Sequence, residues 1–174
     1  MFTKNFKNLM VLNLLNANHG GTDMGTDTTT TPTYYTSSGK ECSNIGNSNK
    51  LYVGLTSALS DTLKTNDYYS KSAHLIIGTG TGTISENDYC LFNEASNCTC
   101  VSAASSTTSN LTKSYTATFQ NNSESDVTIT ETGIMGKLYI ENGWYKVLLE
   151  HTLLETPVII PAGGTRTITY VWSF

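Results

Sequence analysis

Histidine is the side chain best suited to acid–base chemistry near neutral pH, and the chain contains three, His19, His74 and His151. His74 alternates with apolar neighbours in a predicted strand, and His151 follows Glu150 at the predicted end of another. Neither lies in a nucleophile motif such as G-x-S-x-G. The carboxylates that could pair for acid–base work are expected to cap or rim strands: Glu141, Glu150 and Glu155. We therefore predict that the protein is not an enzyme and has no catalytic residue.

The cysteines provide the best candidates for metal ligands. Cys98 and Cys100 are separated by one residue, and Cys90 and His74 could complete a set of four. Structural zinc sites usually contain pairs spaced C-x₂₋₄-C, so this pattern predicts no metal. We expect the cysteines, which include Cys42, to be free thiols, with two disulfides as the alternative.

The glycine run Gly78-Thr79-Gly80-Thr81-Gly82 invites comparison with phosphate-binding loops. Its spacing is G-x-G-x-G, and Thr83 occupies the position of the last glycine in the dinucleotide-binding motif. No Gly-Lys-Ser/Thr follows, and no long helix is predicted whose N-terminus could bind a phosphate. The run therefore predicts a loop between strands with a mobile backbone, and no nucleotide cofactor.

The elements that position these residues are predicted strands. Along Thr165–Phe174, the apolar residues fall on one parity and the hydroxyl residues on the other, which indicates a strand with one buried face. Asn142-Gly143 predicts a hairpin that joins Lys137–Glu141 to Trp144–Glu150. Pro161–Gly164 predicts the next reversal of a C-terminal meander. The apolar residues of the last strand are Ile168, Tyr170, Trp172 and Phe174.

Further strands are predicted before this region. They cover Ala73–Ile77, Cys90–Phe92, Thr99–Ala103, Tyr115–Phe119 and Val127–Thr130. Together the patterns predict an all-β domain over residues 51–174, an antiparallel β-sandwich of jelly-roll or immunoglobulin-like type.

Residues 1–50 differ in composition and are predicted to form a short helix, from the N-cap Thr3 to Asn16, and an extended Thr/Ser/Asn-rich arm. The run Leu9–Leu15 resembles the core of a signal peptide, but Asn13 interrupts it and no A-x-A-like site follows. The apolar surface of this helix predicts docking on a neighbouring subunit, with packing on its own domain as the alternative. We expect deletion of residues 1–50 to leave a folded domain that fails to assemble. The candidate interface residues are Phe2, Phe6, Leu9, Met10, Tyr34 and Tyr35.

The amino-acid composition of the chain limits the classes of partner that it can bind. The net charge is −4, and no cluster of Lys and Arg is present, which argues against nucleic acid as a partner. No apolar run approaches the ~20 residues that span a membrane, so no membrane association is predicted. Charged residues make up 14% of the chain, and the deficit is filled by hydroxyl residues, Asn, Gly and 10 Tyr. Such a surface favours a homo-oligomer that is surrounded by copies of itself.

Four segments resemble passages of the small β-rich virion structural proteins of tailed bacteriophages. They are Met1–Phe6, Ile77–Thr83 followed by Asp88–Leu91, Thr118–Ile134, and Thr156–Tyr170. The resemblance covers about the last 100 residues and the first few. It implies a non-catalytic structural component of a phage virion, such as a head fibre, capsid decoration protein, head–tail connector or tail component.

The resemblance implies that the protein is located in the virion and contacts copies of itself and other virion proteins. The alternative is a receptor- or carbohydrate-binding module of a tail tip or fibre. In that case the aromatic residues Tyr34, Tyr35, Tyr68 and Tyr69 are the candidates for stacking on sugar rings.

Overall fold

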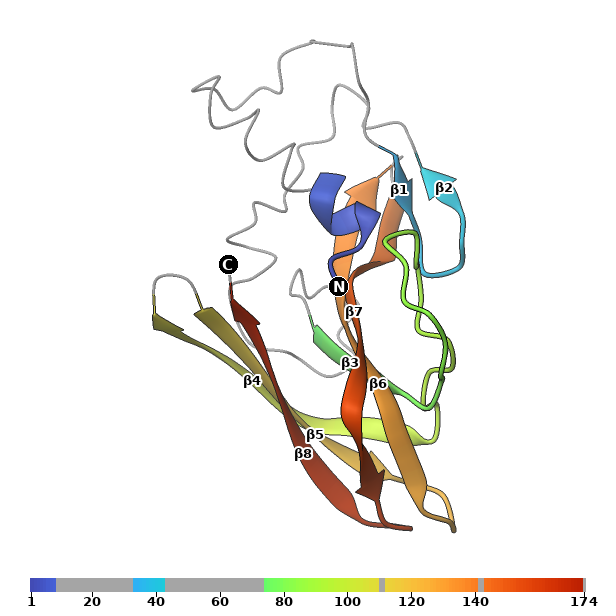
Figure 1. Cartoon of the computed structure of the whole chain (residues 1–174), viewed down its shortest axis with the longest axis vertical. Helices are drawn as coiled ribbons and strands as arrows, with labels where there is room; N and C mark the ends of the chain where they lie inside the picture. Colours follow the sequence, from blue (N-terminus) through green and yellow to red (C-terminus); the bar gives the residue numbers. More distant parts are fainter. Residues whose placement is uncertain (9–32, 43–73, 110–111, 141–142, 174) are drawn as a thin grey trace, which may run out of the picture.

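The computed structural model describes residues 1–8, 33–42, 74–109, 112–140 and 143–173. Within these ranges the protein is all-β, and every sheet is antiparallel. Two three-stranded sheets, of order β3-β6-β7 and β4-β5-β8, form the body, and a two-stranded ribbon, β1-β2, lies at one end (Figure 1). The strands are β1 (Tyr34–Tyr35), β2 (Glu41–Cys42), β3 (His74–Gly78), β4 (Cys98–Ser109), β5 (Thr112–Asn121), β6 (Val127–Ile140), β7 (Gly143–Ile160) and β8 (Thr165–Ser173).

The long hairpin of β6 and β7 confirms the chain reversal predicted near Asn142-Gly143, but not its pairing, because Gly143 is the first residue of β7 and not a turn residue. Its register begins at Ile140 opposite Gly143 and ends at Val127 opposite Ile160. The predicted segments were too short, because β7 continues for 18 residues. His151 was expected at the end of a strand, but it lies near the middle of β7, opposite Gly133.

The β4-β5-β8 sheet confirms the alternation predicted for the last strand. Ile168 is buried, whereas Thr167 and Thr169 are exposed on the other face. These threonines form hydrogen-bonded pairs with the β5 residues that they face, Thr167 with Thr118 at 2.9 Å and Thr169 with Thr116 at 3.1 Å. The side chain of Trp172 and the whole of Phe174 lie outside the described part of the chain.

The strand connections differ from the predicted meander. The chain passes from one sheet to the other between β5 and β6, and it returns between β7 and β8. Asn121 stabilises both crossings, because its buried side-chain amide donates to the carbonyl groups of Ser125, Ile160 and Pro161. The two turn motifs therefore join sheets and do not form hairpins.

One apolar core contains side chains from both three-stranded sheets. The members with the least exposure include Tyr115 of β5, Ile129 and Ile134 of β6, and Val147 and Leu149 of β7. A smaller apolar cluster lies on the other face of the β3-β6-β7 sheet. It consists of Ile76, Leu91, Met135 and Leu148.

The segment from residue 79 to residue 93, the covering loop, runs beside β6 in Figure 1 and contributes Leu91 to this smaller cluster. A strand was predicted at Cys90–Phe92, but these residues lie in the covering loop and form none. Leu91 is the loop residue that enters the apolar cluster, and it is 5% exposed. After the loop, the chain returns along the free edge of β3, where the amide of Ala95 donates to the carbonyl group of Ile77.

The N-terminal residues pack against β7. Residues 4–8 are helical, so the structure describes the first part of the helix predicted to reach Asn16. The backbone amide of Thr3 donates to the carbonyl group of Leu149, and the amide of His151 donates to that of Met1. In the described part of the chain, no helix has the length and hydropathy required to cross a membrane.

Candidate functional site

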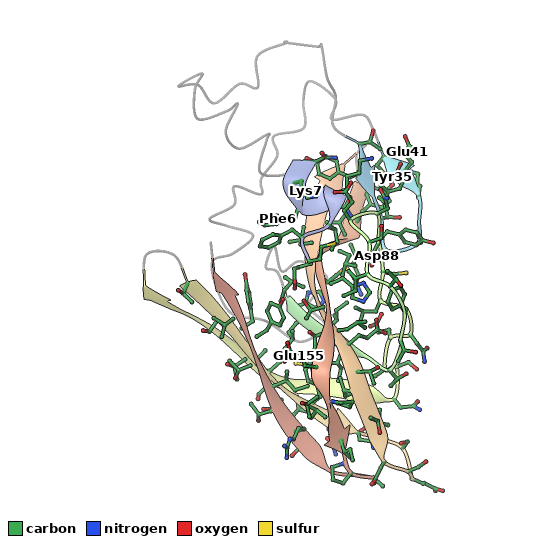
Figure 2. The ribbon with its side chains drawn as sticks, in the orientation of Figure 1. Phe6, Lys7, Tyr35, Glu41, Asp88 and Glu155 are labelled. Atoms are coloured by element: carbon green, nitrogen blue, oxygen red, sulfur yellow. The ribbon has the colours of Figure 1, made fainter. Side chains whose placement is uncertain are left out.

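The chemically distinctive feature of the fold is a buried cluster in which one histidine lies between two carboxylates. Nδ1 of His151 is 2.7 Å from Oδ2 of Asp88, and Nε2 is 2.8 Å from Oε2 of Glu131. The side chains of His151 and Glu131 have no exposed surface, and that of Asp88 is 14% exposed. The three residues come from β7, from the covering loop and from β6, and Figure 2 shows Asp88 beside these strands.

Backbone amides surround the carboxylate of Glu131. Oε1 accepts hydrogen bonds from the amides of Asn93 at 2.8 Å and Gly80 at 2.9 Å, and Oε2 accepts one from Phe92 at 3.0 Å. Burial by itself raises the pKa of Glu131, but these amides and the His151 ring outweigh it, so the pKa lies below the ordinary value. Glu131 is therefore an ionised carboxylate that fastens both ends of the covering loop to β6.

The limited space beside the Glu131 carboxylate explains why glycine occupies positions 78 and 80. A Cβ atom on Gly78 would lie 2.4 Å from Oε1 of Glu131, and one on Gly80 would lie 2.5 Å from the same atom. Only a residue without a side chain lets the backbone come this close. The run was predicted to be a mobile loop, but its first two glycines are packed against Glu131, and the carbonyl group of Gly80 accepts from Thr130 at 2.7 Å.

Asp88 is held in place by its own loop. Its Oδ2 atom accepts a hydrogen bond from the amide of Ser85 at 3.0 Å, and its amide donates to the carbonyl group of Ser85. The ring of Phe92 lies against the imidazole, with 4.7 Å between the ring centroids. The loop therefore contributes a charged group and an aromatic face to the environment of His151.

The contacts of His151 occupy both of its ring nitrogens. Both ring nitrogens face carboxylate oxygens, which only accept hydrogen bonds when ionised, so the contacts are satisfied when the ring carries both protons. Such a ring has no lone pair with which to remove a proton from a substrate or to bind a metal.

The cysteine and histidine set considered as metal ligands does not form a site. Cys98 and Cys100 lie in β4, whereas His74 lies in β3 and Cys90 in the covering loop. Burial raises the pKa of the Cys90 thiol, and Asp88, Glu131 and Glu94 raise it further. Within the described part of the chain, no group of three or more His, Cys, Asp or Glu side chains could hold a metal ion.

A second polar group adjoins the first. The α-amino group of Met1 donates to Oε1 of Glu150 at 2.8 Å and to the carbonyl group of His151 at 2.5 Å. Thr152 also donates to Oε1 of Glu150, at 2.6 Å, and its hydroxyl lies 2.9 Å from that of Tyr170. Glu150 was expected at the rim of a strand, but it is 4% exposed because the N-terminal residues cover it. Glu155 is exposed, and Glu141 lies outside the described residues.

The candidate interface residues occupy different environments. Phe6, which is labelled in Figure 2, and Tyr34 are buried in the core of their own chain. Phe2 is half-buried and stacked on Phe6 at a centroid distance of 4.3 Å. Tyr35 is half-buried. Leu9 and Met10 lie outside the described residues, as do the two sugar-stacking candidates Tyr68 and Tyr69. For residues 1–8, the structure favours the alternative of packing on their own domain.

Sequence reasoning missed Glu131 and Asp88. Glu131 interrupts a threonine-rich alternation in β6 as its one charged residue between Val127 and Gly136, which is a detectable sign of a special environment. Asp88 had no such sign, because a carboxylate in a polar loop is usually solvated. Comparison of the chain with protein-family models, with curated proteins and with solved structures found no match.

Proposed function

We propose that the protein is a non-catalytic structural component of a tailed bacteriophage virion and assembles through repeated contacts with copies of itself and with other virion proteins. The observation that carries this proposal is the convergence of three segments that resemble phage virion proteins. Gly78–Thr83, Asp88–Leu91 and the Glu131 region of Thr118–Ile134 meet at one buried ionic cluster. Sequence motifs that together form a rigid core, and that contribute no reactive group to it, are typical of a structural subunit.

The finer architecture belongs to the same proposal. We take the β3-β6-β7 and β4-β5-β8 sheets to pack as the two layers of a β-sandwich, because their side chains share one apolar core. The outer face of the β5-β8 pair then presents its threonine pairs away from that core. A rigid sheet with an uncharged hydroxyl surface allows many copies to pack closely without charge repulsion.

The structure reduces the support for the sugar-binding alternative. Tyr34 has no exposed surface, and so its ring is not available to stack on a sugar. Tyr35 is half-buried in the β1-β2 ribbon. Among the described residues, the exposed aromatic side chains are instead Tyr89 and Phe92 of the covering loop, each 41% exposed.

Immunogold labelling of purified phage particles tests the proposal. Antibodies raised against the recombinant chain are expected to label particles from a lysate of the strain that carries the gene, at a regular position on the head, neck or tail. Sedimentation of the purified chain is expected to reveal an oligomer. Absence of the protein from purified particles would overturn the proposal, and binding to a glycan array would instead favour the receptor-binding alternative.

A further inference from the structure

The covering loop, residues 79–93, is held by two kinds of contact. One is apolar, since Leu91 packs with Ile76, Met135 and Leu148. The other is ionic, since Asp88 within the loop and the amides of Gly80, Phe92 and Asn93 all bind the His151–Glu131 pair. The loop has further attachments, since Thr130 donates to the carbonyl group of Gly80 and Glu86 binds Lys7 and the amide of Lys4. Of the ion pairs that involve the loop, the one with His151 is buried, whereas the Lys7–Glu86 pair is exposed.

We infer that the Asp88–His151–Glu131 cluster is a proton-operated latch, which keeps residues 79–93 closed on the β3-β6-β7 sheet at neutral pH and releases them in acid. The inference is independent of the phage proposal, because it rests on the cluster alone. It requires the ring of His151 to carry two protons and both carboxylates to be ionised.

Protonation of Glu131 breaks the latch for a geometric reason. A neutral carboxyl group is a weaker acceptor for the amides of Gly80 and Asn93, and its new O–H group faces N–H donors. The His151 imidazolium then loses one of its two counter-charges inside a buried site, which is strongly unfavourable. Release of the loop returns water to the imidazolium and to Asp88.

The other ionisable groups near His151 do not replace Glu131. On the loop side, Cys90 has a raised pKa and is neutral where the latch is closed. The α-amino group of Met1 binds the main-chain oxygen of His151 and not its ring. Glu150 on the same strand is engaged by that amino group. Glu94 acts on Cys90 from the far end of the loop. The groups facing the ring are therefore Asp88 and Glu131.

Hydrogen–deuterium exchange followed by mass spectrometry tests the latch. Exchange is measured on the full chain at pH 7 and pH 3, because the pKa of Glu131 in the folded protein lies below 4.5. The rates are corrected for the intrinsic pH dependence of amide exchange, and a peptide from β5 is the reference. In the wild-type protein, exchange in residues 79–93 is expected to accelerate at least tenfold in acid while the β5 peptide stays protected. Loop and β5 peptides that open together, or a loop equally protected at both pH values, would overturn the inference.

Two variants separate the latch from general acid sensitivity. Glu131→Gln is expected to show fast loop exchange already at pH 7 and little further change in acid. Asp88→Asn changes a loop residue and leaves the sheet intact, so it provides the same comparison if the first variant does not fold. Glu155→Gln, at an exposed position of β7, is the matched control and is expected to behave as the wild type. A loop that keeps wild-type protection at both pH values in both latch variants would contradict the mechanism.

Discussion

His151 and Glu131 are joined by a 2.8 Å contact in a site where neither side chain has exposed surface. The two residues are 20 positions apart in the sequence but lie on paired strands, because β6 and β7 form one long hairpin. Both residues also bind the covering loop. The carboxylate of Glu131 accepts hydrogen bonds from three loop amides, and the imidazole of His151 contacts the loop carboxylate of Asp88.

Replacement of His151 by Gln is expected to destabilise the protein strongly. It leaves Asp88 and Glu131 without the positive charge between them, and breaking a buried ion pair typically costs about 3–5 kcal/mol. Urea unfolding of His151→Gln and of the wild type measures the difference in the free energy of unfolding. The control variant Glu155→Gln is expected to stay within about 0.5 kcal/mol of the wild type. Equal stability of both variants would show that the cluster contributes nothing.

The stability of the folded protein should fall in acid partly because of Glu131. Its pKa is lower in the folded protein than the ordinary value of 4.5, so the unfolded chain takes up the proton first as the pH falls. The stabilisation is therefore present above pH 4.5 and is lost as the pH falls through the folded pKa. The melting temperature should decline more steeply below pH 4.5 in the wild type than in Glu131→Gln. Parallel curves for the two proteins would contradict this assignment.

Gly80→Ala tests the close approach of the glycine run. The added methyl group would lie 2.4 Å from Cβ of Phe92 and 2.5 Å from Oε1 of Glu131, so the loop must move and weaken its amide contacts. Overpacking of this kind costs about 1–3 kcal/mol. Thr81→Ala, one residue along at an exposed position, is the control and should change the unfolding midpoint little. A Gly80→Ala protein as stable as Thr81→Ala would mean that the loop tolerates the side chain.

Asn5→Ala tests whether the N-terminal segment belongs to the folded core. The side chain of Asn5 donates to the carbonyl groups of Tyr35 and Leu148 and accepts from the amide of Tyr35. Loss of this group removes the acceptor of the partly buried Tyr35 amide, at a cost of about 1–3 kcal/mol, whereas the carbonyl group of Leu148 keeps its bond from Thr3. Thermal unfolding of Asn5→Ala is compared with that of Lys4→Ala, which removes an exposed side chain.

These contacts also change the expectation for a larger deletion. The sequence predicted that a chain without residues 1–50 keeps its fold, whereas the burial of Thr3, Asn5 and Phe6 leads us to expect a destabilised protein. Equal melting temperatures of Asn5→Ala and Lys4→Ala would restore the original view of a dispensable arm.

The two faces of β8 are expected to differ in their sensitivity to substitution. Ile168 is 9% exposed within the apolar core, so Ile168→Ala should cost about 2–5 kcal/mol. Thr169 is exposed and loses only its pair with Thr116, a cross-strand contact worth about 0.2–1 kcal/mol. Chemical denaturation of both variants measures the contrast, and sedimentation checks whether either changes self-association. Loss of self-association in Ile168→Ala without loss of stability would identify this face as an interface.

The sequence by itself predicted the strands and turns whose signals lie within a few neighbouring residues. The alternation in Thr165–Ser173 predicted both the strand and its inner face, because neighbouring side chains in a strand point to opposite sides. Asn142-Gly143 predicted the reversal between β6 and β7, since Asn and Gly favour two-residue turns, although Gly143 itself begins β7 opposite Ile140. Such patterns are complete within ten or so residues, and so no knowledge of the rest of the chain is needed.

Only the tertiary structure decided which strands share a sheet and which charges meet. The turns at Asn121 and Pro161 indicated chain reversal but not that the chain would change sheets there, because that choice depends on how the two sheets share the core. Asp88 and His151 are 63 positions apart, and their contact exists because the loop folds over the face of β6 and β7. A carboxylate in a polar loop has the same local sequence whether it is solvated or paired with a buried histidine, so its partner is set by long-range packing.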